Sequence, residues 1–161
     1  MADTQRTAGT AVHPLDPLTA EEITAAARII RAHEGFGEGH RFAYNALHEP
    51  PKEKVLAFRS GNGFEREAFA VLLDRSDGAP YGAVASLSGE SVTLWERVPG
   101  VQPQVMLEEF FESEKIVKAD PGFREAAAKR GMEDLDSVMV DPWSAGHYGD
   151  EEEGRLIRTL A

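Results

Sequence analysis

The side chains best suited to chemistry in this 161-residue chain are its five histidines, and their spacing does not form a metal site. Two imidazoles reach one metal ion from a strand or a helix when they follow His-x-His or His-x3-His, and neither pattern occurs. The chain has no cysteine, so disulfides, thiolate ligands and thiol nucleophiles are excluded. We expect no metal site, and we expect the histidines to be solvated or bonded locally.

Other chemical motifs are equally incomplete. Gly61-Asn62-Gly63 has neither the lysine nor the following helix of a phosphate-binding loop. No serine lies in a Gly-x-Ser-x-Gly turn, so no nucleophile elbow is present. The acidic run Asp150–Glu153 lacks the alternation and the glycine of a calcium loop, and a solvated turn is the better interpretation. We therefore predict no catalytic residue in this chain.

One segment, Asp141–Gly149, has an unusual composition. It places Trp143 and Tyr148 among Gly and Pro residues, which predicts a loop. Trp143 then has two interpretations that the sequence leaves open. It either caps the local core, or it faces a partner surface or a ligand route, where exposed loop aromatics are common.

The elements that position these residues begin with a helix at Thr19, where Thr19 and Glu22 form a capping box. Apolar residues at helical spacing give this helix one buried face and carry it to near His33. That face comprises Ile23, Ala26, Ala27 and Ile30. Strand-like runs follow at Arg41–His48, Val55–Arg59, Glu67–Asp74, Gly82–Leu87 and Ser91–Glu96, the last two joined by a hairpin. We expect helix and strands to bury Ile23, Ile30, Phe42, Phe69, Val71, Leu87 and Leu94 against one another.

A second helix pattern opens at Pro103, after the Pro- and Gly-rich boundary at 99–103. Asp120-Pro121-Gly122 breaks that helix, and a short one follows at Phe123–Lys129. Strands are predicted at Asp136–Val140 and, as an edge strand, at Arg155–Ala161. The chain therefore repeats a unit of helix and antiparallel strands, and we expect the second copy to lack its last strands. The predicted parts are a disordered leader at 1–12, a first domain at 13–98, a linker at 99–102 and a second domain at 103–161.

Composition narrows the class of partner. The net charge of −11 argues against a nucleic-acid or anionic membrane surface, because like charges repel. No stretch approaches the roughly 18 apolar residues of a membrane span. No secretory signal is visible behind Met1, which predicts a cytoplasmic protein.

Three segments together resemble a known family. They are His13–Leu18 with Thr19–Ile23, then Leu107-Glu108-Glu109-Phe110 with its helix, then Val140–Gly146. They resemble the amino-terminal region of copper-containing, topaquinone-dependent amine oxidases, most closely the actinobacterial tyramine, phenethylamine or histamine oxidase type. The resemblance covers roughly residues 13–161. It implies an α+β fold of two consecutive cystatin-like units, each a helix packed on an antiparallel sheet, with the second unit incomplete.

The resemblance also implies a function for the parent protein. Such oxidases are homodimers that convert a primary amine, oxygen and water to an aldehyde, ammonia and hydrogen peroxide. Their large β-sandwich domain holds a quinone formed from a tyrosine in Asn-Tyr-Asp/Glu, an aspartate base and three copper histidines, and the present sequence contains none of these motifs. We expect copper and topaquinone in the parent only, and we expect the fragment to be inactive.

In the family the second small domain helps to wall the channel that leads to the quinone. The matching positions here are Phe110 and Trp143. Relatives often carry a smaller aliphatic residue at the Trp143 position, so a tryptophan there is expected to narrow the route. The alternative hypothesis is a free-standing cystatin-like binding module, which is expected to complete its second sheet.

Overall fold

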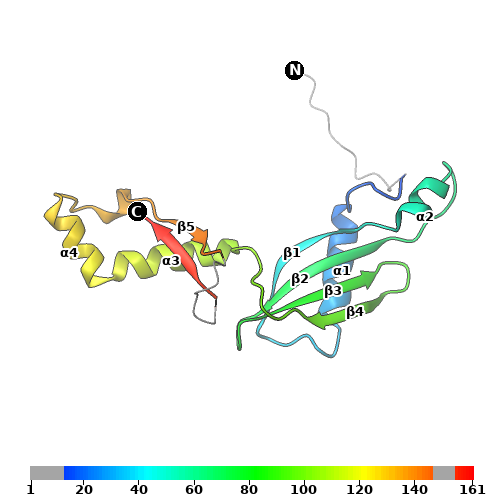
Figure 1. Cartoon of the computed structure of the whole chain (residues 1–161), viewed down its shortest axis with the longest axis horizontal. Helices are drawn as coiled ribbons and strands as arrows, with labels where there is room; N and C mark the ends of the chain where they lie inside the picture. Colours follow the sequence, from blue (N-terminus) through cyan, green and yellow to red (C-terminus); the bar gives the residue numbers. More distant parts are fainter. Residues whose placement is uncertain (1–12, 147–154) are drawn as a thin grey trace, which may run out of the picture. The chain divides into compact units, whose positions relative to one another are not determined.

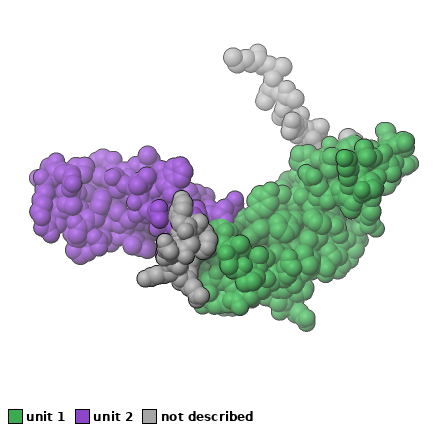
Figure 2. All heavy atoms as spheres, in the orientation of Figure 1, with its two compact units in different colours: residues 1–103 green, residues 104–161 purple. Residues whose placement is uncertain are grey.

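The structure is a computed structural model that describes residues 13–146 and 155–161. The predicted leader, His147 and the acidic run Asp150–Glu153 lie outside the described residues. The chain divides into two compact units, residues 1–103 and 104–161 (Figure 2). Each unit is described by itself below.

Helix α1 (Ala20–Arg31) opens unit 1 with the predicted capping box. The Thr19 hydroxyl accepts the amide of Glu22 at 3.2 Å, and the Glu22 carboxylate accepts the amide of Thr19 at 2.9 Å. These bonds satisfy amides that no helical carbonyl can reach, so they fix where the helix begins.

Four antiparallel strands follow in the order β1-β2-β3-β4 (Figure 1). They are β1 (His40–His48), β2 (Glu67–Asp74), β3 (Ala79–Ser86) and β4 (Ser91–Arg97). The helix lies across one face of this sheet. Four of the five predicted strand runs are confirmed, and so is the hairpin between β3 and β4.

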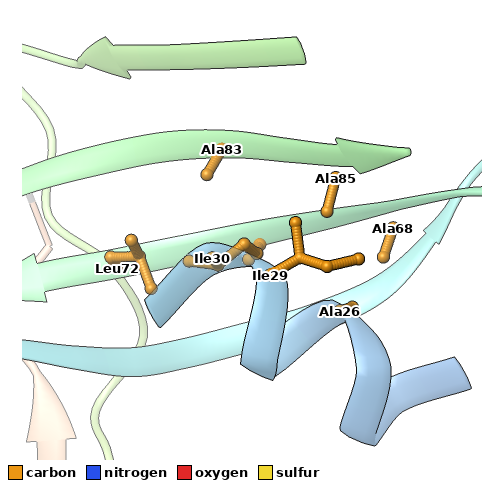
Figure 3. Packing of buried hydrophobic residues seen from close by; sticks show 8 residues of the cluster. Ala26, Ile29, Ile30, Ala68, Leu72, Ala83 and Ala85 are labelled. Atoms are coloured by element: carbon orange, nitrogen blue, oxygen red, sulfur yellow. The ribbon is translucent and has the colours of Figure 1, made fainter. Parts of the chain in front are cut away.

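The core of unit 1 forms between α1 and the helix-facing side of the sheet (Figure 3). The helix contributes Ala26, Ile29 and Ile30, and the sheet contributes Ala68, Ala70, Leu72, Ala83 and Ala85. Alanines on the strands let the helix approach closely, and the isoleucines and Leu72 fill the space between the layers. Ile30 and Leu72 are the largest fully buried side chains among the described residues.

The predicted core was wrong in two respects. Ile23 and Leu94 are 43% and 40% exposed, and the buried stripe of α1 is turned toward Ile29. On β2 the helix-facing positions are 68, 70 and 72, so Phe69 and Val71 lie on the opposite face. Both faces of this strand are apolar, and alternation alone does not tell which one meets the helix.

The predicted strand at Val55–Arg59 was also wrong, because the chain forms a short helix there, α2 (Lys52–Ala57). Pro51 precedes it with φ −52°, and Lys-Glu-Lys-Val-Leu-Ala is a sequence of good helix formers apart from Val55. No residue of α2 is buried. Local propensity therefore decides its conformation.

Unit 2 begins with two helices, α3 (Leu107–Ala119) and α4 (Pro121–Lys129). Asp120 ends the first and caps the second, since its carboxylate accepts the amide of Phe123 at 2.7 Å. Pro121 follows at the first helical position, where a missing amide costs nothing. The predicted break and second helix are confirmed.

The strands of unit 2 differ from the prediction. A single 3₁₀ turn, η1 (Leu135–Ser137), replaces much of the expected strand at Asp136–Val140. The carboxylate of Asp134 accepts both the amide of Asp136 and the hydroxyl of Ser137, which holds this segment in a turn. Strand β5 (Asp141–Ser144) lies where a loop was predicted, and it pairs antiparallel with β6 (Ile157–Leu160). β6 confirms the second predicted strand.

The α+β class is therefore confirmed, with a helix on a four-stranded antiparallel sheet in unit 1. The described part of unit 2 has a helix-backed sheet of two strands. Among the described residues, no helix is both long and apolar enough to cross a membrane.

Candidate functional site

Phe110 lies in the first turn and a half of α3, and its side chain is 38% exposed. Leu107 and Phe111, three positions before it and one after it, are 73% and 57% exposed. Residues three and four apart share one side of a helix, so these side chains form an apolar patch at the start of α3. Such a patch is typical of a surface that meets another protein part or a ligand route.

Trp143 lies in β5 and not in a loop. Its side chain is 59% exposed, whereas the preceding Pro142 is buried. Neighbouring residues of a strand point to opposite faces, so Pro142 faces inward and Trp143 faces solvent. Pro142 has no amide to donate and is tolerated because β5 is an edge strand of the described sheet.

Hydrogen bonding holds the Trp143 side chain. Its indole Nε1–H donates to Oδ2 of Asp141 at 2.8 Å. Across the sheet Trp143 is paired with Arg158, and Asp141 with Leu160. The solvent-facing side of β5–β6 therefore carries an indole, a carboxylate, a guanidinium and a leucine.

The two predicted channel residues lie on elements that pack against each other, because α3 contacts β5. In the described part of the chain no aromatic ring contact joins Phe110 to Trp143. Both residues are exposed in the described structure.

A largely buried ion pair holds the start of α3 and the segment before β6 together. We call Arg155 with Glu109 the unit 2 clamp. Arg155 Nε and Nη2 donate to the two oxygens of Glu109 at 2.5 and 2.6 Å, and Nη2 also donates to the carbonyl of Gln104 at 2.9 Å. Glu109 in turn accepts the amide of Met106 at 2.7 Å, just before α3. The clamp therefore ties the chain entering β6 to the start of α3.

Unit 1 contains the same arrangement, which we call the unit 1 clamp, formed by Arg66 and Glu22. Arg66 donates to both Glu22 oxygens at 2.6 and 3.0 Å and to the carbonyl of Pro17 at 3.1 Å. Glu22 occupies the third position of α1, as Glu109 does in α3, and the carbonyl lies two residues before the helix cap in both units. Burial raises the pKa of Glu22, but hydrogen bonds from Arg66 and Thr19 and the charge of Arg66 outweigh it, so the net pKa is lowered.

Sequence reasoning identified Glu22 through the capping box. Helical spacing predicts Glu109 on the outer face of its helix, and this was wrong, because Glu109 is only 8% exposed. Neither arginine stood out. A usable signal exists, since each arginine stands one or two residues before a strand, 44 or 46 positions after its glutamate.

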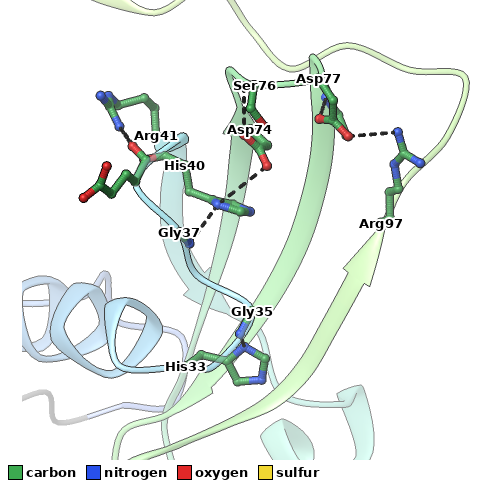
Figure 4. Close-up of polar contacts among 11 residues, drawn as sticks. His33, Gly35, Gly37, His40, Arg41, Asp74, Ser76, Asp77 and Arg97 are labelled. Carbon is green, nitrogen blue, oxygen red and sulfur yellow. Dashed lines mark hydrogen bonds and ion pairs between the residues drawn. The ribbon is translucent and has the colours of Figure 1, made fainter.

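His13, His33 and His40 make contacts within three residues along the chain, whereas His48 Nδ1 lies 2.9 Å from Oε2 of Glu67 on the neighbouring strand. His40 is buried, and its polar contacts are drawn in Figure 4. Its Nδ1 accepts the amide of Gly37 at 3.1 Å, so in the neutral ring the proton is on Nε2. Nε2 is buried and has no hydrogen-bond partner among the described residues. The rings of Phe36, Tyr81 and Trp95 surround it, with centroids 5.2 to 5.5 Å away.

His33 makes a similar contact just after α1, where its Nδ1 accepts the amide of Gly35 and its ring stacks on Trp95. A Cβ at Gly35 would lie 2.8 Å from the Trp95 indole nitrogen, so only glycine allows this approach. The rings of these histidines and aromatic residues pack against one another, and we assign them a packing role in unit 1.

The copper and topaquinone implied by the resemblance do not fit the residues that the structure describes. Within residues 13–146 and 155–161, no three His, Asp or Glu side chains are grouped so that they could hold a metal ion. Ala43 precedes Tyr44, Pro80 precedes Tyr81 and His147 precedes Tyr148, so none of the three tyrosines has the asparagine of the quinone motif. We assign no step of amine oxidation to these side chains.

Comparison with known protein families decides the identity of the two units. Residues 19–94 match the family described as AGAO-like N2 domain, and residues 108–161 match the family described as Copper amine oxidase, N3 domain. The chain belongs to the copper amine oxidase family. Its two units correspond to consecutive amino-terminal domains of these oxidases, as the resemblance predicted.

Relatives from the copper amine oxidase family match nearly the whole chain. It is 41% identical over 150 residues to a primary amine oxidase of Arthrobacter sp. (strain P1), with 92% of this chain and 23% of the relative covered. It is 40% identical over 157 residues to a histamine oxidase of Arthrobacter globiformis, covering 93% and 22%. A primary amine oxidase of Klebsiella aerogenes is 30% identical, covering 92% and 20%. The chain thus spans less than a quarter of the length of these relatives.

Proposed function

We propose that this chain is the non-catalytic amino-terminal part of a copper amine oxidase. The parent oxidatively deaminates primary amines, so that R-CH2-NH2, O2 and H2O give R-CHO, NH3 and H2O2. The observation that carries the proposal is the consecutive match of the two units to two amino-terminal domain families, in the order expected for these oxidases. The name of the Arthrobacter relative, a primary amine oxidase, supports the reaction class.

In the parent, copper and topaquinone supply the redox chemistry from a catalytic β-sandwich domain beyond the matched region. This chain contributes by shaping the substrate channel and by excluding water from it. Phe110 and Trp143 form part of the wall of the substrate channel, where exposed apolar rings remove water from the path of the amine and set its width. The apolar patch at the start of α3 contributes to the surface that meets the catalytic domain or the second subunit of a homodimer.

The net charge of −11 supports this role. Primary amines are cations at neutral pH, and an acidic surface raises their local concentration and speeds their approach. The cytoplasmic location expected from the sequence stays a prediction.

Amine-dependent peroxide release tests the proposal. The isolated chain and the full-length product of its reading frame are expressed, loaded with copper and mixed with methylamine and 2-phenylethylamine in a coupled peroxidase assay. We expect turnover by the full-length protein and none by the isolated chain, with catalase abolishing the signal. Peroxide release by the isolated chain, or inactivity of a folded, copper-loaded full-length protein toward both amines, would contradict the proposal.

A further inference from the structure

A hydrogen bond on the exposed face of β5–β6 joins Trp143 to Asp141. The two residues are two positions apart on β5, so their side chains leave the strand on the same face. The indole Nε1–H donates to Asp141 Oδ2 at 2.8 Å, a good length for a charge-assisted bond. An indole that is 59% exposed is thereby held at both ends, by its Cβ and by its nitrogen.

This bond removes freedom that an exposed tryptophan otherwise keeps. A tryptophan side chain has two rotatable bonds, and on a solvent-facing strand it exchanges between rotamers within nanoseconds. A hydrogen bond at the far edge of the ring selects the rotamers that bring Nε1 to the carboxylate. The other residues of this face, Arg158 and Leu160, lie across the sheet from Trp143 and Asp141.

We propose that Asp141 is a positioning residue for Trp143: it sets the angle of the indole over the open face of β5–β6 and so determines how bulky an amine can pass this part of the channel wall. The inference rests on the proposed function of Trp143 as channel wall. With Asp141 in place the wall is rigid and discriminates by side-chain bulk. Without it the ring moves aside and the discrimination relaxes.

The first test uses the isolated chain and reports on the hydrogen bond. The chain has two tryptophans, so ¹⁵N spectra show two indole N–H peaks, which Trp143→Phe assigns. We expect Asp141→Ala to move the Trp143 peak upfield and to speed its hydrogen exchange about tenfold or more, because an unbonded indole N–H is open to water. Asp141→Asn keeps an acceptor oxygen and is expected to give an intermediate result. Glu133→Ala, an exposed carboxylate of the same unit, is the matched control and is expected to leave the peak in place.

A Trp143 peak that is unchanged in Asp141→Ala would overturn the inference, since the carboxylate would then not hold the ring. Melting temperatures of the variants, which should lie close to that of the parent chain, separate loss of positioning from loss of folding.

The second test uses the full-length oxidase with methylamine as the small amine and 2-phenylethylamine as the bulky one. We expect Asp141→Ala to change the ratio of their kcat/KM values about threefold or more, through KM, with kcat for methylamine unaltered. Asp141→Asn should recover most of the original ratio. If Trp143→Ala shifts the ratio and Asp141→Ala does not, the positioning inference fails and the channel-wall function stands. If neither variant shifts the ratio, the channel-wall function itself fails.

Discussion

At the scale of single residues, exposure separates the side chains that hold unit 2 together from those that face outward. In the segment 140–145, Val140, Pro142 and Ala145 are buried. Trp143 and Ser144, which lie between them, are exposed. The ring area of Trp143 is therefore not part of the core of unit 2. This exposure agrees with the contact to a surface or a ligand that is proposed above for Trp143.

Replacing Trp143 tests this distinction in the isolated chain. We expect Trp143→Ala to lower the free energy of unfolding by no more than about 1 kcal/mol, since it removes little buried area and one exposed hydrogen bond. Urea denaturation followed by circular dichroism measures the change. A loss of about 3–5 kcal/mol, the cost of removing a core aromatic, would instead show that Trp143 is a packing residue.

The sequence left open whether Trp143 is exposed, and it did not predict the strand that carries this residue. Pro142 and Gly146 both indicate a loop, and the pairing that overrides them comes from β6, thirteen or more residues further along the chain. Its bond to Asp141 follows from that strand, because only an extended backbone brings side chains two apart to the same face.

At the scale of elements, the unit 1 clamp and the unit 2 clamp have the same structural role, one in each unit. Each one joins the start of a helix to the start of a strand, through a carboxylate that also caps the helix. The side chains of Arg155 and Glu109 are 14% and 11% exposed, and that of Arg66 is 8% exposed. At such burial the loss of one partner leaves an unpaired charge, which is costly.

We expect Arg66→Lys to destabilise unit 1, and Arg155→Lys unit 2, by about 2–4 kcal/mol each. Lysine keeps the charge but has no planar fork, so it cannot bond both carboxylate oxygens and the preceding carbonyl together. Urea titration followed through the amide peaks of β2 and β6 measures each unit separately. Arg28→Lys is the control, because the Arg28–Glu90 pair is 62% and 67% exposed and its loss should cost less than about 1 kcal/mol. Equal effects at Arg66 and Arg28 would show that the clamp adds nothing beyond a surface pair.

Sequence patterns predicted the elements well wherever one local signal acted alone. Thr19 with Glu22 and Asp120 with Pro121 both mark helix ends through contacts within four residues. The sequence patterns failed where two signals competed. At Val55, for example, a β-branched residue lies among helix formers. The arginines of the clamps were missed because their partners lie 44 and 46 positions away, beyond the reach of periodicity.

At the scale of the whole molecule, the protonation of a few carboxylates is expected to govern acid stability. The pKa of Glu22 is lowered from its ordinary value of 4.5 by the contacts of the unit 1 clamp, which outweigh its burial. The pKa of Asp74 is lowered from 3.8, first by the hydroxyl and then by the amide of Ser76. A carboxylate whose folded pKa is depressed stabilises the fold above its unfolded pKa, and this contribution is lost as the pH falls through the folded value.

We therefore expect the urea midpoint of unit 1 to be constant from neutral pH down to about pH 5 and to fall below about pH 4.5. Glu22→Gln should lower stability at neutral pH and flatten the decline in acid, because the titrating group has been removed. Glu21→Gln, at the exposed neighbouring position, is the control. An unchanged acid profile in Glu22→Gln would show that the clamp carboxylate does not contribute to acid sensitivity.

The design of unit 1 also has a practical consequence for attaching the protein to a surface or a reporter. Helix α2 has no buried residue, and the chain around it is held at its two ends by the β1–β2 pairing and by Arg66. A cysteine in place of Gly63, or a short peptide tag inserted beside it, would meet open space, whereas the positive φ of Gly61 disfavours a side chain there. The tag would lengthen this connection, and doubling such a loop costs only about 0.6 kcal/mol. Because the chain has no cysteine of its own, a single thiol introduced there would give one defined labelling point, well separated in sequence from Phe110 and Trp143.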